Sequence, residues 1–147
     1  MKISLISQIR NEADIIEPFL RHVDALFDSV FLLNHQSCDG TTELLQKAVE
    51  QRPGWKYFLL DFNGKYQEEV SNIFLKEALE AGTDYLIFLD ADEFIAVKNR
   101  KELESSLESI SGNSEIGSFL WRNCIPDDVN TPRFSFSSAL WKSRKIP

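Results

Sequence analysis

Three carboxylates, Asp90, Asp92 and Glu93, directly follow the apolar run at residues 85–89. If the backbone stays extended, Asp90 and Asp92 project to the same side and Glu93 to the other, because side chains alternate along a strand. Two carboxylates side by side repel each other unless a cation or a shared proton compensates them. An oxygen-only pair suits a hard divalent ion such as Mg2+ or Mn2+. The pattern therefore indicates a metal or ligand site; the plainer alternative is a turn or cap aspartate.

The elements that must position these carboxylates alternate between strand and helix patterns. Continuous apolar strands separated by amphipathic helices predict an α/β domain with a mainly parallel sheet. The run at 85–89 is the most apolar of the expected strands, and we expect it at the centre of the sheet. The strands are expected at 2–9, 29–33, 55–60, 85–89 and 116–125, and the helices at 15–26, from Asp39 or Thr41 to Pro53, at 67–81 and at 99–110.

In a parallel α/β sheet, ligands bind beyond the carboxyl ends of the strands. The segments that follow the first four expected strands are 7–12, 34–40, 61–65 and 90–94. We therefore expect the chemistry of this protein to come from these four segments. A phosphate ligand would need a nearby cation. Arg10 is a better candidate for it than Lys65, because Arg10 follows the first strand directly.

Composition and charge exclude several classes of protein. The chain has 147 residues, of which 43% are hydrophobic and 27% charged, as expected for a single folded domain over 1–147. Its net charge of -7 repels phosphate backbones and excludes a general nucleic-acid binder. No apolar run is long enough for a transmembrane segment, and the N-terminal residues do not form a secretory leader. We expect a cytoplasmic protein, with peripheral membrane attachment left open, and reduced thiols at Cys38 and Cys124.

The stretch Asp-Ala-Asp-Glu-Phe at 90–94 resembles the Asp-x-Asp motif of GT-A glycosyltransferases in the family 2-like group. It is most similar to the branch whose motif reads Asp-x-Asp-Glu-Phe. Further pieces follow in the order of that group, and the resemblance covers residues 2–95. These pieces are Arg10-Asn11-Glu12 after the first strand, His22 on the next helix, the Asn-x-Ser-x-Asp-Gly-Thr turn carried at 34–41, and Gln67 ahead of the Asp-x-Asp strand.

The resemblance implies a GT-A-like, Rossmann-like domain that moves a sugar from a nucleotide-sugar donor to a glycan, lipid-linked or small-molecule acceptor. It implies Mn2+ or Mg2+ held by Asp90 and Asp92 against the diphosphate. A Lewis-acidic ion there stabilises the charge that builds on the leaving phosphate oxygen. The nucleotide contacts implied by the resemblance are Ser7, Gln8, Arg10, Asn11, Glu12, Asn34, His35, Asp39, Gln67 and Asp90.

Some features depart from the family pattern. Many members carry an aspartate where this chain has Asn34 or His35, which leaves the base preference open. Family domains usually continue beyond the position of Pro147, so we expect this domain to be incomplete at its C-terminus. The general base is unknown, and Asp127 and Asp128 are weak candidates because Pro-Asp-Asp is also an ordinary loop sequence.

Two other functions stay open at this point. A phosphatase of the haloacid dehalogenase type also uses Asp-x-Asp after an apolar strand, but on its first strand and followed by Thr or Val. A receiver-like module would bind nucleotide without turnover. For His22, a packed helix histidine is the plainer interpretation.

Overall fold

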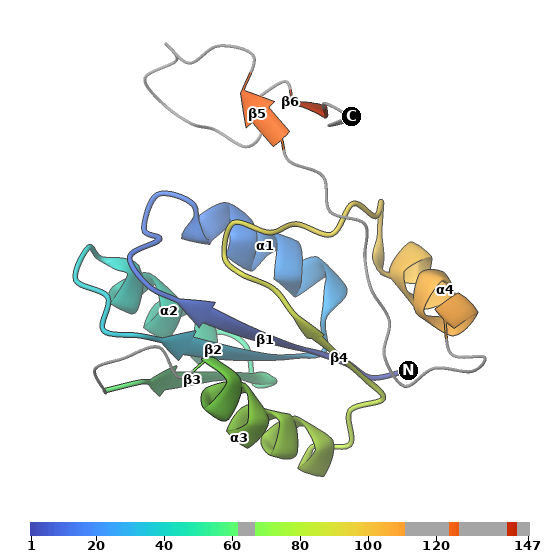
Figure 1. Cartoon of the computed structure of the whole chain (residues 1–147), viewed down its shortest axis with the longest axis horizontal. Coiled ribbons are helices and arrows are strands. Elements are labelled where there is room, and N and C mark those ends of the chain that lie inside the picture. Colours follow the sequence, from blue (N-terminus) through green and yellow to red (C-terminus); the bar gives the residue numbers. More distant parts are fainter. Residues whose placement is uncertain (62–66, 111–123, 127–140, 144–147) are drawn as a thin grey trace. The chain divides into compact units, whose positions relative to one another are not determined.

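The structure is a computed structural model that describes residues 1–61, 67–110, 124–126 and 141–143. The chain divides into two compact units, Met1–Ser109 and Ile110–Pro147. The second unit contains an antiparallel pair of short strands, β5 (Cys124–Pro126) and β6 (Trp141–Ser143). The first unit contains β1 (Ile3–Ile9), α1 (Ile16–Leu26), β2 (Ser29–Asn34), α2 (Thr41–Glu50), β3 (Trp55–Leu59), α3 (Gln67–Glu80), β4 (Tyr85–Phe88) and α4 (Arg100–Ile110) (Figure 1).

Four parallel strands form the sheet of the first unit in the order β3-β2-β1-β4. β1 lies between β2 and β4, and its residue Ile6 is opposite Phe31 on one side and Phe88 on the other. The predicted parallel α/β sheet is therefore confirmed. The central position expected for the fourth strand is wrong, because β4 is an outer strand in the part of the sheet that the structure describes. Its Phe88 is 49% exposed, so the apolarity of a strand did not decide its place.

The helices cover both faces of this sheet (Figure 1). On one face, α1, α2 and α4 bury Phe19, Leu45 and Leu103 against strand residues such as Leu5 and Leu32. On the other face, α3 buries Val70, Phe74 and Ala78 against Ile6, Phe31 and Leu33. The two central strands, β1 and β2, contribute side chains to both cores, because successive side chains of a strand alternate between its two faces. This alternation explains why β1 and β2 are buried almost throughout.

Local signals fix several helix ends. Pro18 lies in the first turn of α1, where a missing N–H costs nothing. Gly82 follows α3 with a φ of 75°, a left-handed conformation that glycine adopts without strain. Asn99 accepts the backbone N–H of Glu102 at 3.1 Å and so caps α4. The strand expected at 116–125 falls largely outside the described residues.

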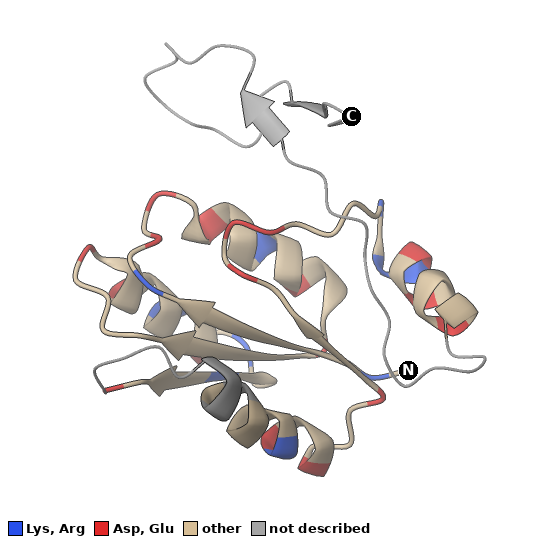
Figure 2. Cartoon of the chain, in the orientation of Figure 1, with Lys and Arg blue, Asp and Glu red and all other residues tan. Residues whose placement is uncertain are grey.

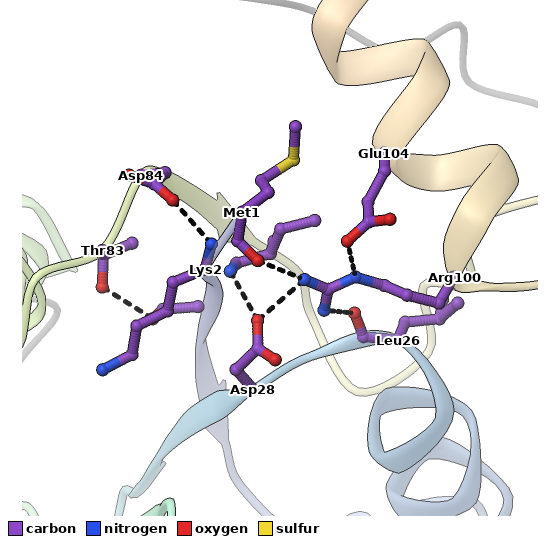
Figure 3. A network of polar contacts seen from close by, with 10 residues as sticks. Met1, Lys2, Leu26, Asp28, Thr83, Asp84, Arg100 and Glu104 are labelled. Carbon is purple, nitrogen blue, oxygen red and sulfur yellow. Dashed lines mark hydrogen bonds and ion pairs between the residues drawn. The ribbon is translucent and has the colours of Figure 1, made fainter.

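A polar network at the amino end of the sheet holds α4 in place (Figure 3). Arg100, the first residue of α4, donates to the carboxylate of Asp28 at 2.8 Å and to the carbonyl oxygens of Leu26 and Met1. Asp28 also accepts the backbone N–H of Ile3 at 2.8 Å. One guanidinium thus joins α4 to β1 and to the α1–β2 connection, at the end of the sheet opposite the carboxyl ends of the strands.

Candidate functional site at the carboxyl ends of β1 and β4

The strand order places a topological switch point between β1 and β4. From β1 the chain builds β2 and β3 on one side, and it then crosses to the other side for β4. The helices change face at the same point: α1 and α2 pack on one side of the sheet and α3 on the other. Open α/β sheets bind ligands beyond the carboxyl ends of their strands, at such a switch point.

The segment after β4 is a turn, not an extended strand. The backbone N–H of Glu93 donates to the carbonyl oxygen of Asp90 at 3.0 Å, which closes a turn over Asp90–Glu93. The Glu93 carboxylate folds back and accepts the N–H of Asp90, also at 3.0 Å. The expectation that Asp90 and Asp92 share one face of an extended strand is therefore wrong. β4 ends at Phe88, and Ala91, a buried residue inside the turn, separates two carboxylates that lie nearer the surface.

The carboxylates of this acidic turn (residues 90–93) act on Glu12 in the loop after β1. Partial burial raises the pKa of Glu12, and the Asp92 carboxylate raises it further, followed by Asp14, Asp39 and Asp90. Partial burial also raises the pKa of Asp90, with Glu93 and then Asp92 adding to the shift. In Figure 2, the loops after β1, β2 and β4 all carry acidic residues. The sheet end therefore concentrates negative charge contributed by three separate loops.

Cations of the described residues do not compensate this charge. The acidic partners of the ion pairs in the part of the chain that the structure describes are Asp24, Asp28, Glu77, Glu80 and Glu104. Within those residues, no three His, Cys, Asp or Glu side chains form a group that could hold a metal by themselves. A site of one or two carboxylates is nevertheless usual for Mg2+, which completes its shell with water and substrate phosphates. The donor chemistry of Asp90 and Asp92 therefore fits a divalent ion that arrives with a phosphate ligand.

The loop after β2 is hydrogen-bonded to the loop after β1. The backbone N–H of Asn11 donates to Ser37 Oγ at 3.0 Å, and the N–H of Cys38 donates to Asn11 Oδ1 at 2.8 Å. Asn11 adopts a left-handed conformation with a φ of 57°, which asparagine tolerates better than most residues. Cys38 is an exposed free thiol. The Asn-Glu and Ser-x-Asp-Gly-Thr pieces of the sequence thus meet as one loop pair.

Asn34, at the end of β2, is fully buried, and its side chain is engaged within the protein. Its Nδ2 donates to Thr42 Oγ1 at 2.8 Å and to the Tyr57 hydroxyl at 3.0 Å. Its Oδ1 accepts the backbone N–H of Ser37 at 3.2 Å. Through these bonds, Asn34 joins β2 to β3 and shapes the loop that follows, which is a structural role. A direct nucleotide contact by Asn34 remains a prediction.

The other predicted contacts lie in different surroundings. Ser7 is buried in β1, and its hydroxyl has no hydrogen-bond partner among the described residues. Gln8 and His35 are half-buried at the ends of β1 and β2, and Arg10 is exposed directly after β1. Gln67 is the first residue of α3, and its side chain lies outside the described part of the chain. Asp127 and Asp128 lie outside the described residues.

Sequence reasoning missed the contact that joins His22 to the segment after the acidic turn. His22 lies in α1, and its Nε2 accepts the backbone N–H of Ile95 at 3.0 Å. The two residues are 73 positions apart. No local pattern reports a contact over that separation; the signal that the sequence offered was the recurrence of this histidine together with the Asp-x-Asp-Glu-Phe motif.

Comparisons with known proteins bear on the family and the fold of this chain. The family model described as glycosyl transferase family 2 matches residues 4–144. Among solved structures, the chain is similar to a mannosyltransferase, PcManGT from Pyrobaculum calidifontis, in complex with GDP-Man and Mn2+, with a TM-score of 0.53 and 20% identity. That likeness covers 75% of this chain and 32% of the mannosyltransferase chain, and it shows a GT-A-like fold. The comparison with curated proteins gives no match. No helix among the described residues is long and apolar enough to cross a membrane.

Proposed function

This chain belongs to glycosyl transferase family 2, and from that premise we propose that it binds a nucleoside-diphosphate sugar with a divalent cation and transfers the sugar to an acceptor. The observation that carries the proposal is the place of Asp90 and Asp92 at the switch point between β1 and β4. This is where an α/β sheet of this order binds nucleotides. An acidic protein needs a cation there to hold a diphosphate, because like charges otherwise repel.

Asp92 is the main proposed metal ligand and Asp90 the second. Mn2+ or Mg2+, when bound, supplies Lewis-acid stabilisation of the charge that develops on the leaving diphosphate. The charge and burial around Asp90 support this assignment, because its carboxylate lies beside Glu93 and Asp92 without a compensating cation among the described residues. The GDP-Man and Mn2+ of the similar mannosyltransferase also support it.

The protein's own groups would bind and orient the nucleotide over the ends of β1 and β2. Arg10 is exposed directly after β1 and can offer a positive charge to a phosphate or ribose oxygen. The hydroxyl of buried Ser7 has no hydrogen-bond partner among the residues that the structure describes, and it can both donate to and accept from a ligand. The remaining proposed contacts are Gln8, Asn11, Glu12, Asn34, His35, Asp39 and Gln67.

Several finer points of the proposal concern the rest of the reaction. A hexose donor is proposed by analogy with the mannosyltransferase, and Asp127 or Asp128 is proposed as general base. The acceptor is a glycan, a lipid-linked molecule or a small molecule, and the proposed location is the cytoplasm. The chain covers 32% of the length of the similar mannosyltransferase chain. Sugar transfer by this chain is therefore part of the proposal.

Calorimetric titration with GDP and UDP, each with Mn2+ and with EDTA, tests the proposed function. We expect binding that requires the metal, followed by sugar release or transfer when the matching nucleotide sugar is supplied. Metal-dependent binding without hydrolysis or transfer would favour a nucleotide-binding module. Absence of binding to either nucleotide, together with release of phosphate from p-nitrophenyl phosphate, would favour a phosphatase and contradict the proposal.

A further inference from the structure

We propose that His22 is a positioning residue that fixes the acidic turn from α1, through a hydrogen bond that its Nε2 accepts from the backbone of Ile95. The inference rests on the proposed function, because it gives this hydrogen bond a purpose at the nucleotide site. It concerns the turn at residues 90–93, which holds the proposed metal ligands, and a side chain that lies on a different element, α1.

Two contacts hold the segment after the turn against α1. His22 Nε2 lies 3.0 Å from the backbone nitrogen of Ile95, whose side chain is buried in the core. The His22 ring also lies against the Phe94 ring, with the ring centroids 5.2 Å apart. The Phe94 ring also packs in a T-shaped arrangement with the ring of Phe19, and their centroids are 6.2 Å apart. Phe19 is fully buried and lies about one helical turn before His22. Both residues that follow the turn are thus in contact with the same helix.

Several other hydrogen bonds of this segment are local. Glu93 and Asp90 bond to each other, and the Val97 N–H donates to the Ile95 carbonyl oxygen at 2.9 Å. Leu89, just before the turn, is bonded to the sheet, because its N–H donates to the carbonyl oxygen of Ile6 at 3.3 Å. The bond from Ile95 to His22 instead joins the far side of the turn to another element. It therefore helps to set where the turn stands relative to the loop after β1, which carries Glu12.

The chemistry of this bond selects one form of the histidine. A backbone N–H can only donate, so Nε2 must keep its lone pair and the ring proton must be on Nδ1. Burial lowers the pKa of His22 and so favours the neutral ring that the bond requires. Groups that hydrogen-bond to the ligands of a metal typically change its affinity about 10–100-fold when removed, and we take the lower end of that range for His22, which bonds the backbone three residues beyond Asp92. If His22 only filled space, the metal affinity would not depend on whether the side chain at this position has an acceptor atom.

Two variants separate the acceptor from the volume of the side chain. His22→Gln keeps an acceptor oxygen at similar reach, whereas His22→Leu fills the space without an acceptor. We expect His22→Leu to weaken Mn2+-dependent GDP or UDP binding about 10-fold or more, and His22→Gln to restore most of it. Equal binding by folded His22→Leu and the wild type would overturn the inference, and so would equal losses in both variants.

NMR of the unliganded protein provides a readout that does not depend on the nucleotide. We expect the 15N signal of His22 Nε2 to be that of an unprotonated nitrogen and the Ile95 amide to exchange slowly. Both exchange protection and the amide signals of residues 90–93 should change in His22→Leu and be preserved in His22→Gln. If His22→Leu does not fold, a protonated Nε2 or fast Ile95 exchange in the wild type still overturns the inference. If the wild type binds neither nucleotide with Mn2+ while these signals behave as expected, the proposed function fails but the positioning contact stands.

Discussion

The carboxylate of Asp39 accepts a hydrogen bond from the backbone N–H of Ala13 at 3.0 Å, and so the loop after β2 holds the loop after β1. Its other oxygen accepts the N–H and the hydroxyl of Thr41 at 3.1 and 2.6 Å. The Thr41 hydroxyl oxygen in turn accepts the N–H of Glu12 at 2.9 Å. One aspartate thus accepts the first backbone N–H of α2 and fixes the backbone that presents Glu12 to the acidic turn.

Replacing Asp39 with Ala should loosen this loop pair. These hydrogen bonds lower the pKa of Asp39, the Thr41 hydroxyl most of all, which means that the folded protein favours the ionised carboxylate. We expect a lower urea midpoint for Asp39→Ala and faster exchange of the Ala13 and Thr41 amides. Asp14→Ala is the matched control, because Asp14 is an exposed acid in the same region. Equal urea midpoints for both variants would contradict the role of Asp39 in holding the two loops together.

Replacing Asp92 with Asn should separate binding from stability. Asp92 is exposed, and its charge adds to the repulsion that acts on Glu12 and Asp90. We expect the variant to be at least as stable as the wild type in urea, because a source of repulsion is gone. Its Mn2+-dependent affinity for GDP or UDP should fall about 10-fold or more. Asp14→Asn removes a charge from the same region and should bind normally; an unchanged affinity of Asp92→Asn would remove Asp92 from the site.

Replacing Asn34 with Ala should cost stability through the partners it leaves behind. The buried amide serves Thr42, Tyr57 and the N–H of Ser37. Leaving buried groups unpaired costs about 1–3 kcal/mol, so we expect a loss of about 3 kcal/mol in the free energy of unfolding. Tyr57→Phe removes one of these bonds and should cost about 1 kcal/mol. A smaller loss for Asn34→Ala than for Tyr57→Phe would show that the amide is not the centre of this network.

The pair formed by Asp28 and Arg100 predicts a pH dependence of stability. Burial alone would raise the pKa of Asp28, but the bonds from the Ile3 N–H and Arg100 outweigh it and lower the pKa. The ionised form is therefore favoured in the folded state. Its stabilisation is complete above the unfolded pKa of about 4 and is lost as the pH falls through the folded value.

Asp28→Asn should therefore lose less stability than the wild type on acidification below about pH 4. Because the Asp28 side chain is 46% exposed, solvent screening limits the difference to about 1 kcal/mol. Urea midpoints at neutral pH and at two acidic pH values measure it. Glu104→Gln removes only the partner of Arg100 within α4. This variant should lose as much stability at acidic pH as the wild type does. If the urea midpoints of Asp28→Asn and the wild type fell equally on acidification, Asp28 would not be the source of this pH dependence.

Adding one methyl group at Gly54 should destabilise the sheet. A Cβ at this position would lie 2.5 Å from the backbone carbonyl oxygen of Asp28, which cannot rotate away. We expect Gly54→Ala to cost about 1–3 kcal/mol. Gly82→Ala is the control, because a Cβ there meets open space and only the φ of 75° is unfavourable, which costs about 1 kcal/mol. Thermal unfolding measures the loss for both variants, and Gly54→Ala should have the lower midpoint. A lower midpoint for Gly82→Ala would contradict the close approach of Gly54 to the Asp28 carbonyl oxygen.

The amino-acid sequence by itself determined the elements of the sheet and the order of the motifs. Strand runs and helical periods are local, so residues such as Ile3, Phe19 and Gly82 carried enough information to place β1, α1 and the end of α3. The parallel α/β class followed from the same patterns. Two of the motif pieces, at 10–12 and 90–94, also fell after β1 and β4, the strands that flank the switch point.

Only the tertiary structure decided the order of the strands and the form of the site. The turn that brings Glu93 back to Asp90 spans three residues, and the strand pattern did not report it. The outer place of β4 and the approach of Asp92 to Glu12 depend on pairing between distant segments. So does the bond from Ile95 to His22, which spans 73 positions. Periodicity reports which face a side chain takes within its own element, but a contact between elements depends on strand register and packing, which no local pattern encodes.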